Sequence, residues 1–303
     1  ITVPLPVIVR GENGRWHLFS SSRVAHGQSY EGFYIAQGGD YDGKIVERNA
    51  AGEEVRPIDL SLTKTAFALL FNSALLMLIV LGAARWYKRH PVRTSAPGGF
   101  VGLMEAAVMM IHDDLIKSCV GKDYKRFAPY LLTVFFFILI NNLMGLVPIF
   151  PGGANVTGNI AITLLLAIAT FIMTNVFGTR EYWKEIFWPE VPTWLKCPVP
   201  MMPAIEFVGI LTKPFALMIR LFANMMAGHA VILSLTCLVF VTVSMGPVVN
   251  GSMTVVSVIF CIFMNLLELL VAFIQAYVFT MLSAVFIGLA RVEPHHKKEE
   301  QEI

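Results

Sequence analysis

Long uncharged stretches dominate the pattern of apolar and polar positions along the chain. Residues 127–179 hold no Asp, Glu, Lys, Arg or His in 53 positions, and residues 199–290 hold only four charges and one histidine in 92. A helix that spans a bilayer needs about 20 apolar residues, so these two stretches have room for several such helices. The pattern therefore predicts an all-α polytopic membrane protein.

We expect about five membrane-crossing helices and one interfacial helix. The first crossing runs from about Leu60 to Tyr87, and the next polar segment, Phe100–Val120, fits an amphipathic helix that lies at the membrane interface. Two further crossings are expected over about Phe127–Val147 and Asn159–Gly178.

The last two apolar segments are too long to stand upright in a bilayer. They are Pro203–Met245 and Ser252–Ala290, joined by the sequence GPVVNG. As continuous helices each would be roughly 60 Å long at 1.5 Å per residue, against a hydrocarbon core of about 30 Å. We therefore expect two long, strongly tilted helices that form an antiparallel hairpin.

The first 57 residues differ from the rest because their charges are interleaved with glycines. The runs VPLPVIVR and RWHLFSSS, separated by GENG, predict two strands joined by a turn. We expect a short β-rich, extracytoplasmic extension over residues 1–57 and a membrane domain over 58–303, with a cytoplasmic tail at 291–303. The chain starts at Ile1 rather than Met, which a removed signal peptide or a shortened chain would explain.

Positive residues predict the orientation. Lys and Arg gather in RWYKRHPVR, in the 180–196 loop and in the tail, whereas PIFPGGANVTG and GPVVNG hold none. Loops rich in Lys and Arg stay in the cytoplasm. With five crossings, the N-terminal segment is expected outside and the C-terminus inside.

Composition narrows the function classes. The chain is 56% hydrophobic and only 15% charged, with a mean hydropathy of +0.65, whereas soluble domains carry about 25% charge. Its net charge of +2 does not suggest a nucleic-acid partner. The four cysteines lack metal-ligand spacing and no phosphate-binding glycine loop occurs. We expect no metal, no cofactor and no nucleotide chemistry, and we interpret His112–Asp114 as a wet helix face.

Charged groups inside a membrane cost several kcal/mol by insertion scales and are therefore functional candidates. Glu206, Lys213 and Arg220 are spaced by seven and form one stripe along a helix. Asn224 lies one turn beyond Arg220 on the same face.

An antiparallel hairpin pairs positions whose numbers have a nearly constant sum. One register places Arg220 and Asn224 level with Gln275, and His229 level with Glu268. His and Glu side chains can relay protons once their pKa values are shifted. Arginine stays protonated, so it can only hold a partner ionised or block a cation. The spacing predicts a proton path beside a fixed positive barrier.

Each candidate also has a plainer interpretation. Glu206 and Lys213 can extend to the interface from a helix end. His229 with Glu268 can be a structural pair between helices, and Arg220 can serve packing alone.

Two segments then carry a resemblance to a known family. KPFALMIRLFANMMAGH (213–229) and ELLVAFIQAYVFTMLSAVFIGLA (268–290) resemble the signature stretches of subunit a of F-type ATP synthases, in a bacterial form with an outer N-terminal extension. The similarity continues through RFAPYLLTVFFFILINNLMGLVP (126–148) and TGNIAITLLLA (157–167). It covers roughly residues 100–290.

The resemblance implies a proton-conducting stator subunit of the Fo sector, with two offset half-channels that load and unload the c-ring carboxylates. It assigns eight residues: Arg220 as the charge that faces the ring carboxylate, Asn224 and Gln275 beside it, His229 and Glu268 in the outer half-channel, Asn142 and Asn159 in its lining, and Glu206 in the cytoplasmic half-channel. The family often has an Asn at the position of Ala161 and an acid at that of Gly145.

The implied partners are the c-ring proteolipid subunits, the subunit b peripheral stalk, the rest of the F-type complex and the lipid bilayer. The implied location is the bacterial inner membrane, with the mitochondrial inner membrane as the alternative. The subunit itself would not be an enzyme. A secondary ion transporter would instead show internal repeats and broken helices. A proton-pumping subunit of a respiratory complex would carry Lys and Glu in several separate helices.

Overall fold

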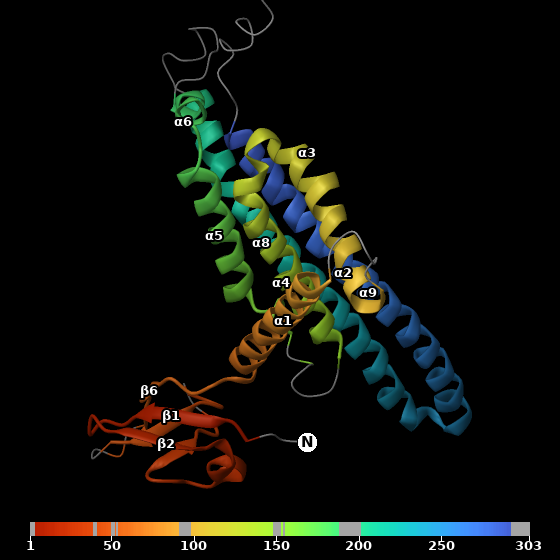
Figure 1. The fold of residues 1–303 in the computed structure, drawn as a ribbon. Coiled ribbons are helices and arrows are strands. Elements are labelled where there is room, and N and C mark those ends of the chain that lie inside the picture. Colours follow the sequence, from red (N-terminus) through yellow and green to blue (C-terminus); the bar gives the residue numbers. More distant parts are fainter. Residues whose placement is uncertain are drawn as a thin grey trace, which may run out of the picture. The chain divides into compact units, whose positions relative to one another are not determined.

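The computed structural model describes residues 4–38, 41–49, 52, 54–90, 98–147, 153, 155–187 and 201–291. The chain divides into two compact units, one formed by Ile1–Phe71 with Ile149–Ala154 and the other by Asn72–Pro148 with Asn155–Ile303. Figure 1 shows their strands and helices. Predictions that fall on 188–200 and 292–303 lie outside the described residues.

Three strands of the first unit form one antiparallel sheet in the order β2-β1-β6. β1 (Pro6–Arg10) pairs with β2 (Trp16–Ser20), and the chain between them turns through a hydrogen bond from Gly14 N to Gly11 O of 2.9 Å. The predicted strand pair is thereby confirmed. β6 (Ile58–Asp59) pairs with the other edge of β1.

A second antiparallel sheet has the order β3-β4-β5. Its strands are β3 (Phe33–Ile35), β4 (Ile45–Arg48) and β5 (Glu54–Val55), and short 3₁₀ turns at Ser21–Arg23 and Ala25–Gly27 lead into it. One apolar cluster supports this unit: Val7, Val9, Phe19, Val24 and Phe33. Its members are buried because alternate residues of a strand point to the same face of the sheet.

Helix α1 (Lys64–Arg89) begins four residues later than predicted. The reason is that the preceding residues remain bonded to β1: Leu60 N donates to Ile8 O at 2.9 Å and Leu62 N to Pro6 O at 3.3 Å. Thr63 then caps the helix, its Oγ1 accepting from Ala66 N at 3.2 Å.

Residues Gly99–Leu146 form a nearly continuous helical stretch of 48 residues. It consists of α2 (Gly99–Met109), a π-helical segment (Met110–Ile116), α3 (Lys117–Val120), a 3₁₀ turn (Gly121–Asp123) and α4 (Tyr124–Leu146).

The segment predicted to be amphipathic has that character. Ile111, Leu115 and Ile116 are buried, whereas Asp113 and Asp114 are exposed. The wet-face interpretation of this segment is confirmed.

The remaining helices are α5 (Ile160–Val176), α6 (Arg180–Phe187), α8 (Met201–Thr242) and α9 (Pro247–Ala290). α8 continues through Pro214, and α8 and α9 form the predicted antiparallel hairpin. The predicted linker GPVVNG was wrong, because proline fits the first turn of a helix and α9 begins at Pro247. The turn lies at Val243–Gly246, where Gly246 has a φ of 106°.

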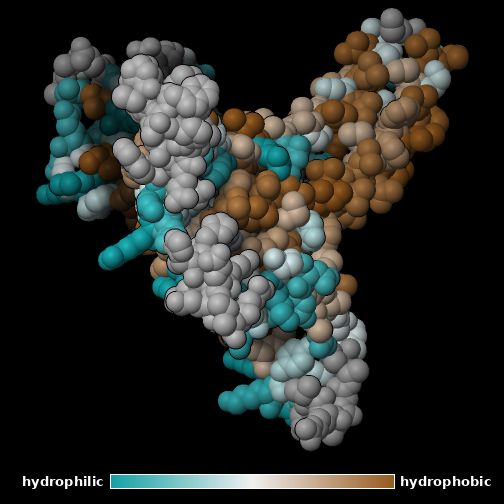
Figure 2. Space-filling model, turned by 90° about the horizontal axis from the view of Figure 1, so that it is seen from above, coloured by the Kyte–Doolittle hydropathy of each residue, from teal (hydrophilic) through white to brown (hydrophobic). Residues whose placement is uncertain are grey.

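Four helical stretches are long and apolar enough to cross a membrane: Lys64–Arg89, Gly99–Leu146, Ile205–Thr242 and Pro247–Ala290. α5, an apolar helix of 17 residues, lies at the short end of the range for a spanning helix. The all-α membrane fold is therefore confirmed. Figure 2 shows hydrophobic residues over the arm formed by the hairpin, whose exposed side chains include Leu233, Phe240, Val248, Ile262 and Leu266.

The core of the second unit lies where α4, α8 and α9 meet. Its largest buried side chains include Phe127 and Phe135 of α4, Leu217 and Leu221 of α8, and Phe279 of α9. α5 packs along α8, and α3 packs along the end of α9. These contacts hold the hairpin at the end opposite its turn.

Gly288 marks the tightest approach of α9 to α3. A Cβ built on Gly288 would lie only 2.1 Å from the carbonyl oxygen of Cys119. We expect Gly288→Ala to force these helices apart and to lower the free energy of unfolding by about 1–3 kcal/mol. Thermal unfolding of the purified protein in detergent measures this. Gly251→Ala, in the same helix but with no atom within 4 Å of the added Cβ, is the matched control and should leave the melting temperature unchanged or raise it.

Candidate functional site

Arg220 is an exposed charge on a face of α8 that also carries the exposed Asn224 and is otherwise mainly apolar. Among the described residues, its guanidinium has no hydrogen-bond or ion-pair partner. The exposed positions one turn to either side are small, Ala216 and Ala223, and the same face continues to Ala227. A second helix can therefore approach the backbone of α8 closely at this level.

Asn224 and Gln275 join α8 to α9 next to Arg220. Asn224 Nδ2 donates to Gln275 Oε1 at 2.7 Å. Gln275 is 3% exposed, and its Nε2 is buried without a hydrogen-bond partner. Asn224 and Gln275 lie at the same level of the hairpin, so this prediction is confirmed. The Nε2 group of Gln275 remains at this level as an amide donor without a partner among the described residues.

His229 and Glu268 form the second polar level of the hairpin, as the register predicted. His229 Nδ1 lies 3.1 Å from Glu268 Oε1. The Glu268 side chain is 4% exposed and that of His229 is 29% exposed. The contact lacks hydrogen-bond geometry, so both buried carboxylate oxygens are without a donor among the described residues. A buried carboxylate in this state is stabilised by a proton or by a nearby positive charge.

Gly228 allows the Glu268 carboxylate to lie against the backbone of α8. A Cβ on Gly228 would be 2.9 Å from Glu268 Oε1 and 3.0 Å from its carboxyl carbon. Sequence analysis did not single out Gly228. The signal that could have revealed this contact is its position next to His229, at the level of Glu268.

Asn142 is bound to α9 between its two functional candidates. Its Nδ2 donates to Ala272 O at 3.3 Å, and its Oδ1 accepts from Thr157 Oγ1 at 2.7 Å. Ala272 lies one turn from both Glu268 and Gln275 on the same face of α9. Asn142 and Thr157 are fully buried. Sequence reasoning identified Asn142 but missed Thr157.

A buried pair of amide side chains, which the sequence analysis did not identify, connects α1 with α4. Asn72 Nδ2 donates to Asn141 Oδ1 at 3.0 Å, and Asn141 Nδ2 donates to Phe137 O at 2.8 Å. Asn72 Oδ1 is buried without a partner. Polar residues thus lie on two adjacent positions of α4, each contacting a different helix.

Asn159 is not brought together with these residues by any contact that the described part of the chain shows. Its Oδ1 accepts from Ala161 N at 3.0 Å and so caps α5, and its side chain is exposed. The lining function expected of Asn159 stays a prediction.

Glu206 and Lys213 lie toward the beginning of α8, away from the His229–Glu268 level. Glu206 is exposed and is 14 positions, or about 21 Å of helix, before Arg220. Lys213 Nζ lies 5.4 Å from the centroid of the Phe286 ring. Burial, and the negative charge of Glu206, raise the pKa of the Tyr182 phenol. Glu206 and Tyr182 are therefore electrostatic neighbours.

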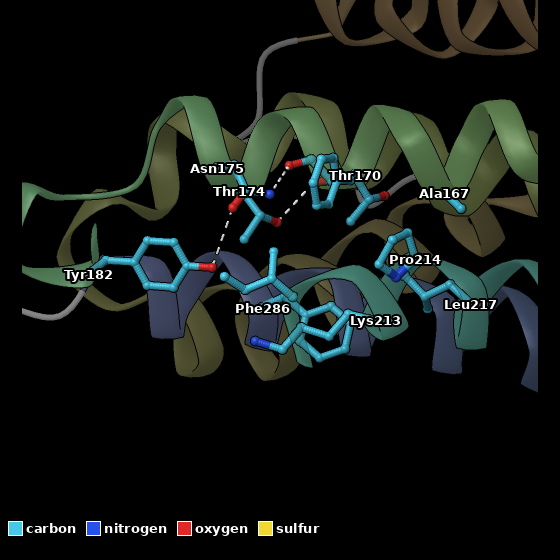
Figure 3. A pocket seen from close by; sticks show the side chains of 11 residues that line it. Ala167, Thr170, Thr174, Asn175, Tyr182, Lys213, Pro214, Leu217 and Phe286 are labelled. Atoms are coloured by element: carbon cyan, nitrogen blue, oxygen red, sulfur yellow. Dashed lines mark hydrogen bonds between the residues drawn. The ribbon is translucent and has the colours of Figure 1, made fainter. Parts of the chain in front are cut away.

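A small pocket lies beside Lys213, between α5, α6, α8 and α9. Figure 3 shows Tyr182 reaching toward Asn175, to which its hydroxyl donates at 3.5 Å. Thr170 and Thr174 of α5 also line the pocket, together with Lys213. The pocket is mainly apolar, and its few polar side chains lie toward the beginning of α8, on the other side of Arg220 from Glu268.

The described residues hold no group of three or more His, Cys, Asp or Glu placed to bind a metal ion. The site therefore consists of Arg220, which has no partner in the described part of the chain, and two separate polar regions along the hairpin. This is an arrangement that can move protons.

The sequence profile of the family described as "ATP synthase A chain" matches residues 69–288. The chain is also 44% identical over 254 residues to ATP synthase subunit a of Chloroherpeton thalassium, which covers 81% of this chain and 71% of the relative. The chain belongs to the ATP synthase subunit a family. The resemblance found from the two signature stretches is confirmed.

Other relatives of the same name agree. ATP synthase subunit a of Chlorobium phaeobacteroides is 43% identical over 271 residues, covering 86% of this chain and 75% of the relative. That of Myxococcus xanthus is 41% identical over 245 residues, covering 79% and 76%. The first unit has its own match, because residues 1–61 fit the family described as "Domain of unknown function (DUF8433)".

Substitution of Gly228 tests whether the Glu268 carboxylate lies against the backbone of α8. We expect Gly228→Ala to displace the carboxylate and to lower the free energy of unfolding by up to about 1 kcal/mol, because the added methyl group lies too close to Oε1 but the Glu268 side chain can move. Thermal unfolding in detergent measures the change.

Two controls accompany it. Gly209→Ala, on α8 with no atom within 4 Å of its Cβ, should be neutral. In a Glu268→Ala background the cost of Gly228→Ala should largely disappear. An equal cost in both backgrounds contradicts the contact.

Proposed function

We propose that the chain conducts protons as the non-rotating subunit a of the Fo sector, through two half-channels that meet the c-ring at the α8–α9 hairpin. The observation that carries the proposal is Arg220, which is exposed on α8 and has no ion-pair or hydrogen-bond partner among the described residues. The subunit carries no nucleotide chemistry of its own in this account. The ring carboxylate is the partner that Arg220 lacks.

The cost of Arg220 supports this assignment. An arginine at the centre of a spanning helix costs about 2.5–3.5 kcal/mol by insertion scales. Because arginine is not deprotonated in proteins, a carboxylate brought to it loses its proton. The small side chains of Ala216 and Ala223 let a ring helix come close enough for that exchange.

We assign the outer half-channel to the polar level at His229 and Glu268. The Glu268 carboxylate and the Gln275 amide are buried with unsatisfied polar atoms, and Asn142 holds the same face of α9. A proton that enters here is handed on by the His229–Glu268 level, where Nδ1 and Oε1 lie 3.1 Å apart and a small turn of either side chain aligns them for transfer. It then loads a ring carboxylate.

We assign the cytoplasmic half-channel to the beginning of α8. Glu206 is exposed there, and the pocket beside Lys213 adds the polar groups of Asn175 and Tyr182. Arg180 and Lys184 of α6 lie near this end, and such charges favour the cytoplasmic side. This orientation places the first unit outside.

The cycle follows from the separation of the two regions. A protonated, neutral ring carboxylate turns through the lipid, reaches Arg220, ionises, and releases its proton toward Glu206. Arg220 prevents the two half-channels from joining into a leak. Each charge gains about 2.3 kcal/mol per 100 mV of membrane potential, so several protons drive one synthesis step.

The proposal includes partners and location. The partners are the proteolipid c-ring, the subunit b stalk and the remaining subunits of the complex, and the membrane is the bacterial inner membrane. A secondary transporter is not favoured, because α8 and α9 are continuous rather than broken helices.

Loss of the charge at Arg220 should abolish coupling. We expect Arg220→Ala to reduce proton-driven ATP synthesis in membrane vesicles to background, since no group then ionises the ring carboxylate. Leu233→Ala, at an exposed apolar position of α8, is the control and should retain most activity. Near-normal synthesis by Arg220→Ala would overturn the proposal.

The His229–Glu268 pair gives a second test. Because the two side chains face each other at 3.1 Å, the double exchange His229→Glu with Glu268→His should retain more synthesis than either His229→Ala or Glu268→Ala. ATP synthesis in vesicles containing equal amounts of subunit measures this. If the exchange is no better than the single losses, the pair does not act as one proton relay.

A further inference from the structure

The outer face of the β2-β1-β6 sheet is apolar, although it points away from the core of its unit. Residues opposite each other in an antiparallel pair share a face. Arg10 lies opposite both Trp16 and Ile58. Ile8 lies opposite Leu18, and it bonds to Leu60 on its other side. We call these six residues the outer face.

The side chains of this face are open to solvent. Trp16 is 54% exposed, Leu18 73%, Ile58 60% and Leu60 63%. The opposite face of the same sheet is the buried one, as the apolar cluster of the unit shows. An antiparallel sheet with one buried face normally presents polar residues on the other. Contiguous exposed apolar residues of this kind mark an interaction surface.

The sheet is attached to the membrane helix almost without a linker. Its hydrogen-bonded ladder continues beyond β6 to Leu62, and α1 begins at Lys64 with Thr63 as its cap. The uncharged part of α1 starts at Thr65. At 3.3–3.6 Å per residue, the distance from Leu62 to Thr65 is at most about 11 Å.

That distance matches the boundary of a bilayer. The polar layer on each side of the hydrocarbon core is roughly 5–8 Å thick. Leu62 therefore lies in or just above the headgroups wherever α1 crosses. Because alternate strand residues share a face, Ile58, Leu60 and Leu62 form one apolar row that leads directly to the membrane entry point.

The outer face also carries the residue types of a membrane interface. The Arg10 guanidinium lies 5.9 Å from the centroid of the Trp16 ring. Tryptophan is enriched at headgroup level, and arginine forms charge-assisted hydrogen bonds with phosphate. The pair is suited to the boundary between acyl chains and lipid phosphates.

We propose that the outer face docks on the lipid surface around α1, with Trp16, Leu18, Ile58 and Leu60 in the interface and Arg10 at the phosphates. This gives the N-terminal unit a function as a membrane-bound collar of α1. It is separate from the proton path, and it holds on whichever side of the membrane the unit lies.

Lipid-exposure measurements on the assembled complex in phospholipid nanodiscs test the proposal. The four native cysteines are replaced by alanine, and a single cysteine is introduced by Leu18→Cys and labelled with a bimane fluorophore. Lys44→Cys is the matched control, at an exposed position next to the second sheet. Quenching is measured with lipids carrying a headgroup nitroxide and with iodide in the water. Trp16→Cys provides a second position on the outer face.

We expect the nitroxide lipids to quench the label at Leu18 several-fold more than the label at Lys44, and iodide to quench it several-fold less. Equal iodide quenching at both positions, without lipid quenching at Leu18, would show a water-exposed face and overturn the proposal. Protection of Leu18 from both quenchers would also overturn it, because a protein partner would then cover the face. Normal ATP synthesis by the labelled complex shows that the outcome is independent of the proton path.

Discussion

The antiparallel register of α8 on α9 is the constraint on which the rest of the structure depends. Asn224 bonds to Gln275, and His229 lies against Glu268, so a rise of five positions on one helix matches a fall of seven on the other. A shift of the hairpin by one turn would break the hydrogen bond of the buried Gln275 and move the buried Glu268 away from His229. Losing a partner for a buried polar group is costly, so these contacts favour the observed register.

The same register determines what remains unpaired. With Asn224 bonded to α9, Arg220 one turn away is left on the open face of α8 among small residues. Gly228 lets Glu268 approach at the second level, and α4 reaches α9 between the two levels through Asn142. The buried acid and the free cation are thus kept on different faces, which separates a loading region from a barrier.

The pairing of α8 with α9 could largely be predicted from the spacing of polar residues in the sequence. Intervals of seven and an antiparallel sum are enough to place Asn224 with Gln275 and His229 with Glu268. Contacts between helices far apart in the sequence, such as Asn72 with Asn141, have no such signal because nothing in the sequence sets the angle between α1 and α4. Helix ends were misjudged where a local rule competed with a tertiary contact, as at Leu60, which remains in the sheet.

A high-resolution structure of the assembled complex in lipid would show whether Arg220 faces a carboxylate of the ring. The measured quantity is the distance from the Arg220 guanidinium to the nearest ring carboxylate. We expect a ring carboxylate at ion-pair distance from Arg220 in at least one rotational state, with no other acidic side chain beside it. An Arg220 that faces lipid, or that pairs with a carboxylate of a non-rotating subunit, would contradict it.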